Sequence, residues 1–278
     1  MKTIDEGVLA DYNAGAERGR LRAGLGLLEF ARTKELLRKA LPKPPAVIYD
    51  IGGAYGEYSW FLTSLGYEVH LFDLSETNIA LSAELAGEFP GVSLAAAEVG
   101  DAREIPRADG SADAVLLMGP LYHIVEREER LAALREGRRL LKRGGVLVSS
   151  AICRYATTLW SLSVYGPGNT LLDDGAFRGM LARELADGHH IRPEHSSYHG
   201  IGRSFFHLPE ELEGELREAG FLSNDIRAVE GCGVLVPDLG ELWKEEVRRE
   251  IVLDLVRRTD REPGILGLTP HLLAISEG

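Results

Sequence analysis

The sequence predicts an α/β protein built on a doubly wound, mostly parallel seven-stranded sheet. Short apolar segments alternate with amphipathic ones, and the first apolar segment runs directly into a cluster of glycines. The length of 278 residues fits one large domain. Strands that alternate with helices in this way form a parallel sheet with helices on both of its faces.

Each element follows from a local pattern. In the first forty residues leucines recur at helical spacing until Pro42, Pro44 and Pro45 end the helix. Runs of apolar residues predict seven strands over residues 46–51, 67–73, 92–96, 112–118, 146–151, 221–229 and 272–275. Amphipathic spacing predicts helices over residues 58–65, 78–88, 126–141, 209–219 and 239–258.

We expect one domain over residues 1–278. Its four parts are an N-terminal helical lid (1–42), a ligand-binding core (46–152), an insertion after the fifth strand (155–206) and the C-terminal part of the sheet (207–278). The periodic pattern weakens in the insertion, and we therefore interpret it as a segment that covers the sheet.

Composition and charge argue against several classes of protein. Hydrophobic residues make up 45% and charged residues 27%, as in a globular protein with a full core. The net charge of −12 opposes phosphate binding and argues against a nucleic-acid substrate. Two cysteines, Cys153 and Cys232, are too few for a disulfide framework, and we interpret them as reduced thiols. No signal peptide or membrane-spanning run is visible, so we expect a cytoplasmic protein.

A glycine-rich turn follows the first strand. Asp50 ends this strand, Gly52, Gly53 and Gly56 follow it, and a helix is expected immediately afterwards. Glycine lets a ligand approach the backbone closely, and the start of a helix adds N–H groups without helical partners. Asp73 ends the second strand, where an acid can accept hydrogen bonds from ribose hydroxyls.

A third acid, Asp101, follows the third strand. All three acids lie at the carboxyl ends of expected strands, where open α/β sheets bind ligands. Their order predicts a ligand that contains a nucleoside. The turn lacks the Gly-x-Gly-x-x-Gly spacing of dinucleotide-binding proteins. Asp50 would also repel a pyrophosphate, whereas it would suit a ligand with an amino group.

These motifs resemble those of class I methyltransferases that use S-adenosylmethionine, in a branch that acts on small molecules in bacteria. The segment DIGGAYG (50–56) is similar to the first family motif, VHLFD (69–73) to the second and GDA (100–102) to the third. The likeness extends to MGPLYHI (118–124), LLKRGGVL (140–147), YNAGAERGRL (12–21) and LTPHLLA (268–274). It implies a Rossmann-like methyltransferase fold, S-adenosylmethionine as cofactor, S-adenosylhomocysteine as product, and no metal.

The resemblance also assigns roles by position. Asp73 would hold the ribose hydroxyls with Leu74 beside the adenine, and Asp101 would bind the adenine amino group near the Ala102 N–H. Arg20 would pair with the cofactor's carboxylate. The methionine part is expected among Tyr12, Arg20, Asp50, Gly52, Gly53, Gly56, Met118 and Gly119. The segment SETN (75–78) is more polar than this branch leads us to expect.

Methyl transfer from a sulfonium is a direct displacement, so the protein must above all align the reacting atoms. A general base is needed only when the acceptor arrives protonated. His123, together with Tyr122, follows the fourth strand and is the candidate base. A structural role in capping or packing the next helix is an equally good interpretation of His123.

Histidines gather in and after the insertion, at positions 189, 190, 195, 199 and 207. Histidines and aromatic residues above the ligand end of a sheet would suit an acceptor pocket, for which we expect His199, Arg203 and His207. Their spacing matches no standard metal motif, so we favour a solvated loop over a metal site.

The sequence therefore predicts methyl transfer from S-adenosylmethionine to an oxygen, nitrogen or carbon atom of a small molecule. An RNA or protein methyltransferase and a non-catalytic S-adenosylmethionine-binding module are the alternatives. The missing Gly-x-Gly-x-x-Gly counts against a nicotinamide-dependent oxidoreductase. The sequence leaves open the acceptor and whether the protein is a monomer or a homodimer.

Overall fold

The computed structural model describes residues 18–194, 198 and 200–278. Its centre is a seven-stranded sheet of order β3-β2-β1-β4-β5-β9-β8, in which β1 to β5 are parallel and β9 is antiparallel to both of its neighbours. The strands are β1 (Val47–Ile51), β2 (Glu68–Asp73), β3 (Ala96–Val99), β4 (Ala112–Leu117), β5 (Leu141–Ile152), β8 (Ser223–Ala228) and β9 (His271–Glu277). The predicted mostly parallel, seven-stranded sheet is confirmed.

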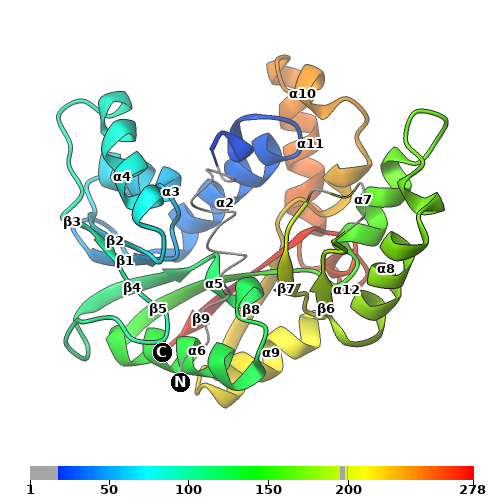
Figure 1. The fold of residues 1–278 in the computed structure, drawn as a ribbon. Coiled ribbons are helices and arrows are strands. Elements are labelled where there is room, and N and C mark those ends of the chain that lie inside the picture. The colour runs from blue at the N-terminus through cyan, green and yellow to red at the C-terminus, as the bar shows by residue number, and fades with distance from the viewer. Residues whose placement is uncertain (1–17, 195–197, 199) are drawn as a thin grey trace.

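Helices flank the sheet (Figure 1). The described α-helices are α2 (Gly26–Ala40), α3 (Glu57–Ser64), α4 (Glu76–Leu85), α5 (Pro120–His123), α6 (Arg127–Leu140), α7 (Ala156–Val164), α8 (Gly175–Asp187), α9 (Pro209–Glu218), α10 (Leu239–Leu242), α11 (Glu246–Thr259) and α12 (Pro263–Leu266). Short 3₁₀ helices are η1 (Arg20–Arg22), η2 (Ala86–Glu88), η3 (Leu171–Asp173) and η4 (Gly231–Leu235).

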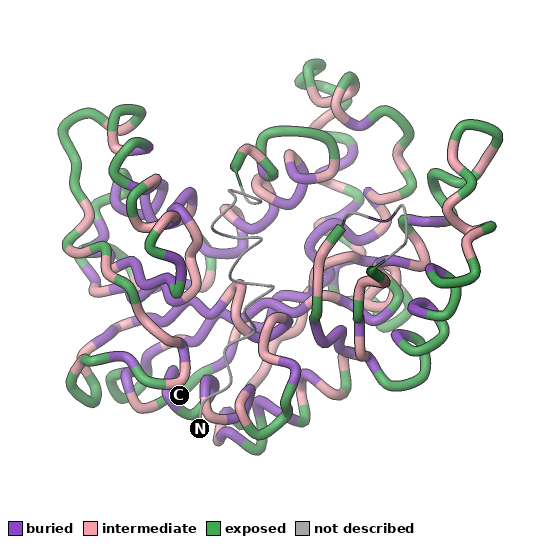
Figure 2. The backbone as a smooth tube through the Cα atoms, viewed as in Figure 1, coloured by how far each residue is buried: buried purple, intermediate pink, exposed green. Residues whose placement is uncertain are grey.

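The core has two apolar layers, one on each face of the sheet. Leu37 of α2 and Leu62 of α3 pack against Ile48 on one face, whereas α6 and α9 pack on the opposite face together with Tyr49. Neighbouring residues of β1 thus belong to different layers, because side chains alternate across a strand. The buried residues concentrate in the strands and on the helix surfaces that turn toward them (Figure 2). The fold is therefore doubly wound, as predicted.

The insertion contains regular structure that the sequence pattern did not reveal. After β5 the chain forms α7, η3, α8 and a separate two-stranded sheet of β6 (His189–Ile191) and β7 (Arg203–Phe205). These elements lie on the side of the molecule opposite α3 and α4, with α2 between them (Figure 1). The strands of this small sheet are only three residues long, which is too short for a clear alternation of apolar and polar residues.

Several predicted elements differ from those observed. The third strand is predicted over residues 92–96 but lies at Ala96–Val99, because an edge strand that is half exposed is not marked by its apolar content. The helix predicted over 239–258 is divided into α10 and α11. The helix predicted over the first forty residues is interrupted in its described part, since Gly19 and Gly24 have positive φ angles before α2 begins.

In the part of the chain that the structure describes, no helix has the length and apolar character needed to cross a membrane. Cys153 is buried and Cys232 is half-buried, and both are free thiols. Burial raises the pKa of the Cys153 thiol to about 11, which keeps it protonated at neutral pH.

Candidate cofactor and active site

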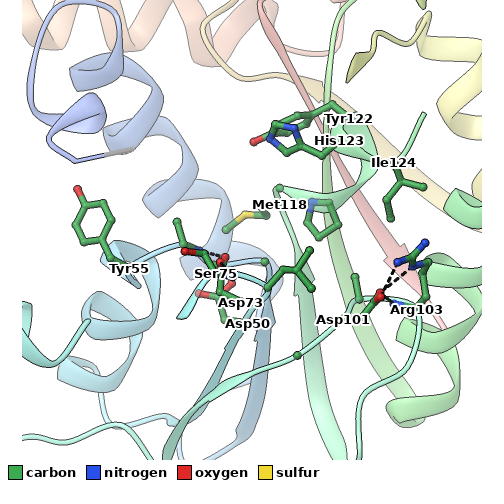
Figure 3. A pocket seen from close by; sticks show the side chains of 18 of the residues that line it. Asp50, Tyr55, Asp73, Ser75, Asp101, Arg103, Met118, Tyr122, His123 and Ile124 are labelled. Atoms are coloured by element: carbon green, nitrogen blue, oxygen red, sulfur yellow. Dashed lines mark hydrogen bonds and ion pairs between the residues drawn. The ribbon is translucent and has the colours of Figure 1, made fainter. Parts of the chain in front are cut away.

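A pocket lies at the carboxyl ends of the parallel strands (Figure 3). It brings together predicted site residues from the first 125 positions with one residue of the insertion. The predicted residues that line it are Arg20, Asp50, Gly52, Gly53, Asp73, Leu74, Asp101, Ala102, Met118, Gly119, Tyr122, His123 and Arg203. Gly56 and His207 do not line the pocket, and Tyr12 and His199 lie outside the described residues.

The floor of the pocket depends on glycine at two neighbouring turns. Gly52 follows β1 with a φ of 72°, and its N–H donates to the Phe72 carbonyl at 2.7 Å. A Cβ atom at Gly52 would lie 2.5 Å from the Pro120 ring, and one at Gly119 would lie 2.7 Å from the Gly52 carbonyl oxygen. The turns after β1 and β4 therefore touch backbone to backbone, which leaves peptide groups exposed to a ligand.

Asp50 is a buried carboxylate with one unsatisfied oxygen. Only 1% of the residue is exposed, and its Oδ2 accepts a hydrogen bond from Ser59 Oγ at 2.6 Å. Its Oδ1 has no hydrogen-bond partner among the described residues. Burial raises the pKa of Asp50 to about 6, and the nearby charge of Asp73 adds to this shift. A cationic ligand group at this oxygen would satisfy both its charge and its hydrogen bonding.

Asp73 is held by the polar segment that follows it. Its Oδ2 accepts from the Ala54 N–H at 2.8 Å, and its Oδ1 accepts from the Ser75 N–H at 2.9 Å and from Asn78 Nδ2 at 3.0 Å. Ser75 also caps α4, because its Oγ accepts from the Asn78 N–H. The polar residues at 75 and 78 therefore fix a carboxylate at the pocket wall, a role that sequence reasoning missed although it noted their polarity.

Asp101 forms a bidentate ion pair that sequence reasoning also missed. Arg103 donates to its two carboxylate oxygens at 2.8 and 2.6 Å, and a second branch of the guanidinium reaches Glu129 at 2.7 Å. The sequence places the arginine only two positions after the acid, but such spacing alone does not indicate where a long side chain points. This pair lies at the end of the pocket away from Asp50 (Figure 3).

Tyr122 and His123 lie in α5, a single turn that begins at Pro120 directly after β4. Their ring centroids are 4.5 Å apart, and both residues line the pocket. Figure 3 shows both rings on the far side of Met118 from Asp50 and Asp73. The structure thus places an imidazole and a phenol across the pocket from the buried carboxylates.

Two of the predicted residues differ in their surroundings from what the sequence suggested. Arg20 lines the pocket, but its guanidinium forms a bidentate pair with Glu29 at 2.5 and 2.9 Å. His207 is fully buried beside Glu215, with 3.3 Å between Nε2 and the carboxylate, and burial lowers its pKa despite that neighbour. His207 is therefore a core residue, and its proximity in sequence to the insertion was misleading.

Arg203 joins the insertion to the pocket. It lies in β7, and its guanidinium approaches the Glu126 carboxylate to 3.5 Å. Both side chains are largely exposed, so this ion pair adds little stability. Arg203 thereby places a cation of the insertion at the pocket, which residues of α5 also line.

Residues 48–145 match the model of the methyltransferase domain family. This span runs from β1 into β5 and contains the glycine turn together with Asp50, Asp73, Asp101 and the α5 turn. With the observed sheet order, this match shows a methyltransferase domain on the class I methyltransferase fold.

Solved structures of low sequence identity share the fold. A methyltransferase from Mesorhizobium loti is 18% identical with a TM-score of 0.57, and the match covers 90% of this chain and 100% of that one. A methyltransferase from Methanosarcina mazei is 20% identical with a TM-score of 0.56, over 87% and 96% of the two chains. A complex of the Haloferax volcanii Trm112 methyltransferase activator with its methyltransferase matches at 17% identity and a TM-score of 0.56, over 99% of each chain. No curated protein matches the sequence.

Proposed function

We propose that the protein transfers the methyl group of S-adenosylmethionine to an oxygen, nitrogen or carbon atom of a small molecule. The observation that carries this proposal is one continuous pocket. It is lined on one side by Asp50, Asp73 and the glycine turn and on the other by Tyr122, His123 and Arg203. The net charge of −12 further disfavours a nucleic-acid acceptor.

The residues of the pocket suit the parts of the cofactor. Asp50, with its unsatisfied Oδ1, would bind the ammonium group. Asp73, fixed by three N–H donors, would accept from the ribose hydroxyls. The adenine would lie between Leu74 and Ala102, near Asp101. Gly52, Gly53, Met118 and Gly119 would surround the methionine part, while Gly56 shapes the turn as the N-cap of α3.

Catalysis would rest mainly on alignment. When bound, S-adenosylmethionine supplies an activated methyl group, so the protein must place the acceptor in line with it and exclude water. His123 would accept a proton from a hydroxyl or ammonium acceptor, with Tyr122 packed against its ring. Arg203 would contact the acceptor from the insertion side. The insertion and the N-terminal segment would together close the pocket around a small molecule.

A macromolecular acceptor is the second candidate. The Haloferax volcanii structure contains an activator subunit, Trm112, and such a subunit is a means by which a methyltransferase of this fold could work on a larger substrate. In that case the isolated chain would bind the cofactor but transfer no methyl group without a partner.

The test is a methyl-transfer assay with labelled S-adenosylmethionine and three acceptor fractions: small molecules below about 1 kDa, total RNA and total protein. The proposal predicts label only in the small-molecule fraction, and none with Asp73→Ala. Arg217→Ala, which changes an exposed residue of α9 that pairs with Glu213, is the matched control and should transfer normally. Label in RNA or protein would contradict the proposed acceptor class.

A further inference from the structure

A second group of charged side chains lies beside the pocket, and its two carboxylates, Glu29 and Glu230, are buried. His271 Nδ1 lies 2.6 Å from Glu230 Oε1 and 3.8 Å from Glu29 Oε2. Glu230 is fully buried, and its other oxygen accepts from Thr269 Oγ1 at 2.9 Å and from the His271 N–H at 3.1 Å. Glu29 in turn receives both branches of the Arg20 guanidinium. The four charged residues form a continuous chain of contacts in the order Glu230, His271, Glu29, Arg20.

The topology places this chain of contacts at the ligand edge of the sheet. His271 is the first residue of β9, which runs antiparallel to β5 and pairs His271 with Ile152 at the carboxyl end of that strand. The carboxyl ends of β1, β2 and β4, where the pocket lies, are at the same edge. One end of the chain of contacts, Arg20, lines the pocket itself.

The charges alternate in sign along the chain of contacts. Burial alone would lower the pKa of His271, but the carboxylates of Glu29 and Glu230 outweigh it and raise the pKa to about 9. His271 is therefore an imidazolium at neutral pH, and its Nδ1–H donates to Glu230. Glu29 then lies between two cations, His271 and Arg20. This alternation stabilises the buried carboxylates of Glu29 and Glu230, which would each be costly to bury alone.

We propose that Glu230, His271 and Glu29 are positioning residues that hold the Arg20 guanidinium at the pocket wall to bind the carboxylate of the cofactor's amino-acid part. This inference rests on the proposed cofactor placement. The ammonium and carboxylate of an amino acid are attached to the same carbon, so the cation for the carboxylate must lie near Asp50. Arg20 lies toward that end, since it lines the pocket and the N–H of the preceding residue, Gly19, donates at 3.1 Å to the hydroxyl of Tyr55 in the glycine turn after Asp50.

The physical reason is preorganisation. An arginine side chain loses rotamer entropy when it is fixed, and a contact that fixes it before the ligand arrives removes that cost from binding. A guanidinium has five N–H donors in a rigid fork and can bridge two carboxylates. Glu29 would thus orient the fork, while His271 and Glu230 hold Glu29.

Glu29, Glu230 and His271 could also form a metal site, because the atoms that could coordinate a metal ion all lie within 4.8 Å of one another. The Arg20 guanidinium on Glu29 and the proton on His271 Nδ1 both oppose a second cation there. We therefore assign the group to arginine positioning and make metal binding an outcome of the test.

The experiment compares two ligands by calorimetry: S-adenosylhomocysteine, which has the amino-acid part, and 5′-methylthioadenosine, which lacks it. We expect Glu29→Gln and His271→Gln to weaken the affinity for S-adenosylhomocysteine by about tenfold or more. The affinity for 5′-methylthioadenosine should fall by less than about twofold. In an Arg20→Ala background, His271→Gln should cause no further loss. Arg18→Ala, an exposed arginine outside the pocket, should change neither affinity.

Equal losses for both ligands would overturn the inference, because a purely structural role weakens the whole site. Stoichiometric Zn²⁺ binding that raises the melting temperature of the wild type but not of His271→Gln would also overturn it. Should Glu29→Gln and His271→Gln fail to fold, Arg20→Lys is the alternative variant, because it keeps the positive charge but removes the planar set of guanidinium N–H donors. An S-adenosylhomocysteine affinity unchanged in Arg20→Lys would refute the inference. Failure of the wild type to bind S-adenosylhomocysteine would instead refute the proposed function.

Discussion

Asp50 is a residue whose burial costs stability in the ligand-free protein. A carboxylate with 1% exposure and an oxygen without a partner is costly in the absence of a ligand. Its pKa is raised from 3.8 to about 6, so the folded protein binds this proton more tightly than the unfolded chain does. Ionisation of Asp50 therefore destabilises the ligand-free protein above about pH 6, and the cost is relieved as the pH falls from 6 toward 4.

This predicts opposite effects of Asp50→Asn on stability and on binding. At pH 7 the ligand-free variant should be more stable to urea than the wild type by on the order of 1–3 kcal/mol, since each pKa unit corresponds to about 1.4 kcal/mol. It should bind S-adenosylhomocysteine about tenfold or more weakly. Wild-type affinity should itself fall as the pH drops below 6, and the variant should lack this dependence. A variant that binds as tightly as the wild type at pH 7 would remove Asp50 from the cofactor site.

His123 carries the prediction for catalysis. If it accepts the acceptor's proton, His123→Gln should lower kcat by about 10²–10⁴-fold. The affinity for S-adenosylhomocysteine should stay within about twofold of wild type, because the proposed role lies on the acceptor side. His189→Gln, which changes a histidine of β6 paired with Asp187, is the control and should keep full activity. An unchanged kcat for His123→Gln across the pH range would leave alignment as the sole source of catalysis.

Among the elements, the turns after β1 and β4 form the floor of the proposed cofactor pocket. They touch through Gly52 and Gly119, and a Cβ atom at Gly119 would lie 2.7 Å from a backbone oxygen that cannot move independently. Gly119→Ala should therefore weaken cofactor binding by about tenfold or more and lower the melting temperature. Gly179→Ala offers a matched control on α8, where a Cβ meets nothing within 4 Å and alanine should stabilise the helix by up to about 1 kcal/mol. Normal binding by Gly119→Ala would show that the two turns can separate.

The sequence predicted the elements that a local pattern determines. β1, β2 and β4 lie within one residue of their predicted bounds because each is a short, buried apolar run next to the pocket. β3 was misplaced because an edge strand is defined by its partner β2 rather than by its own composition. The break between α10 and α11 was missed because a continuous amphipathic pattern does not show where the chain turns to pack against η4.

The residues of the candidate site also divide into those that a local sequence pattern indicates and those that depend on contacts in three dimensions. Asp50, Asp73 and Asp101 were found because each ends or follows a strand, which is a local property. Ser59 and Arg103 were missed as their partners because those contacts depend on where a helix and a loop lie in three dimensions. The Glu230–His271 pair joins residues 41 positions apart, and no local pattern indicates it.

At the scale of the whole molecule, the sheet order explains why residues far apart in sequence meet. Parallel strands bring the ends of β1, β2 and β4 to one edge, and antiparallel β9 brings its first residue to that same edge. Arg20, which precedes α2, and Arg203 of the insertion also line the pocket at this edge. In the proposed function, the class I methyltransferase fold would position the cofactor, while the segments added to it would contact the acceptor.

The most direct test of the central claim is thermal unfolding of the wild type and Asp73→Ala with S-adenosylmethionine, S-adenosylhomocysteine or NAD in excess. A ligand at about 100 times its dissociation constant stabilises the folded state by about 2.7 kcal/mol. We expect a clear upward shift of the wild-type melting temperature with S-adenosylmethionine and S-adenosylhomocysteine only, and a much smaller shift for Asp73→Ala. A shift with NAD alone, or no shift with any ligand, would contradict it.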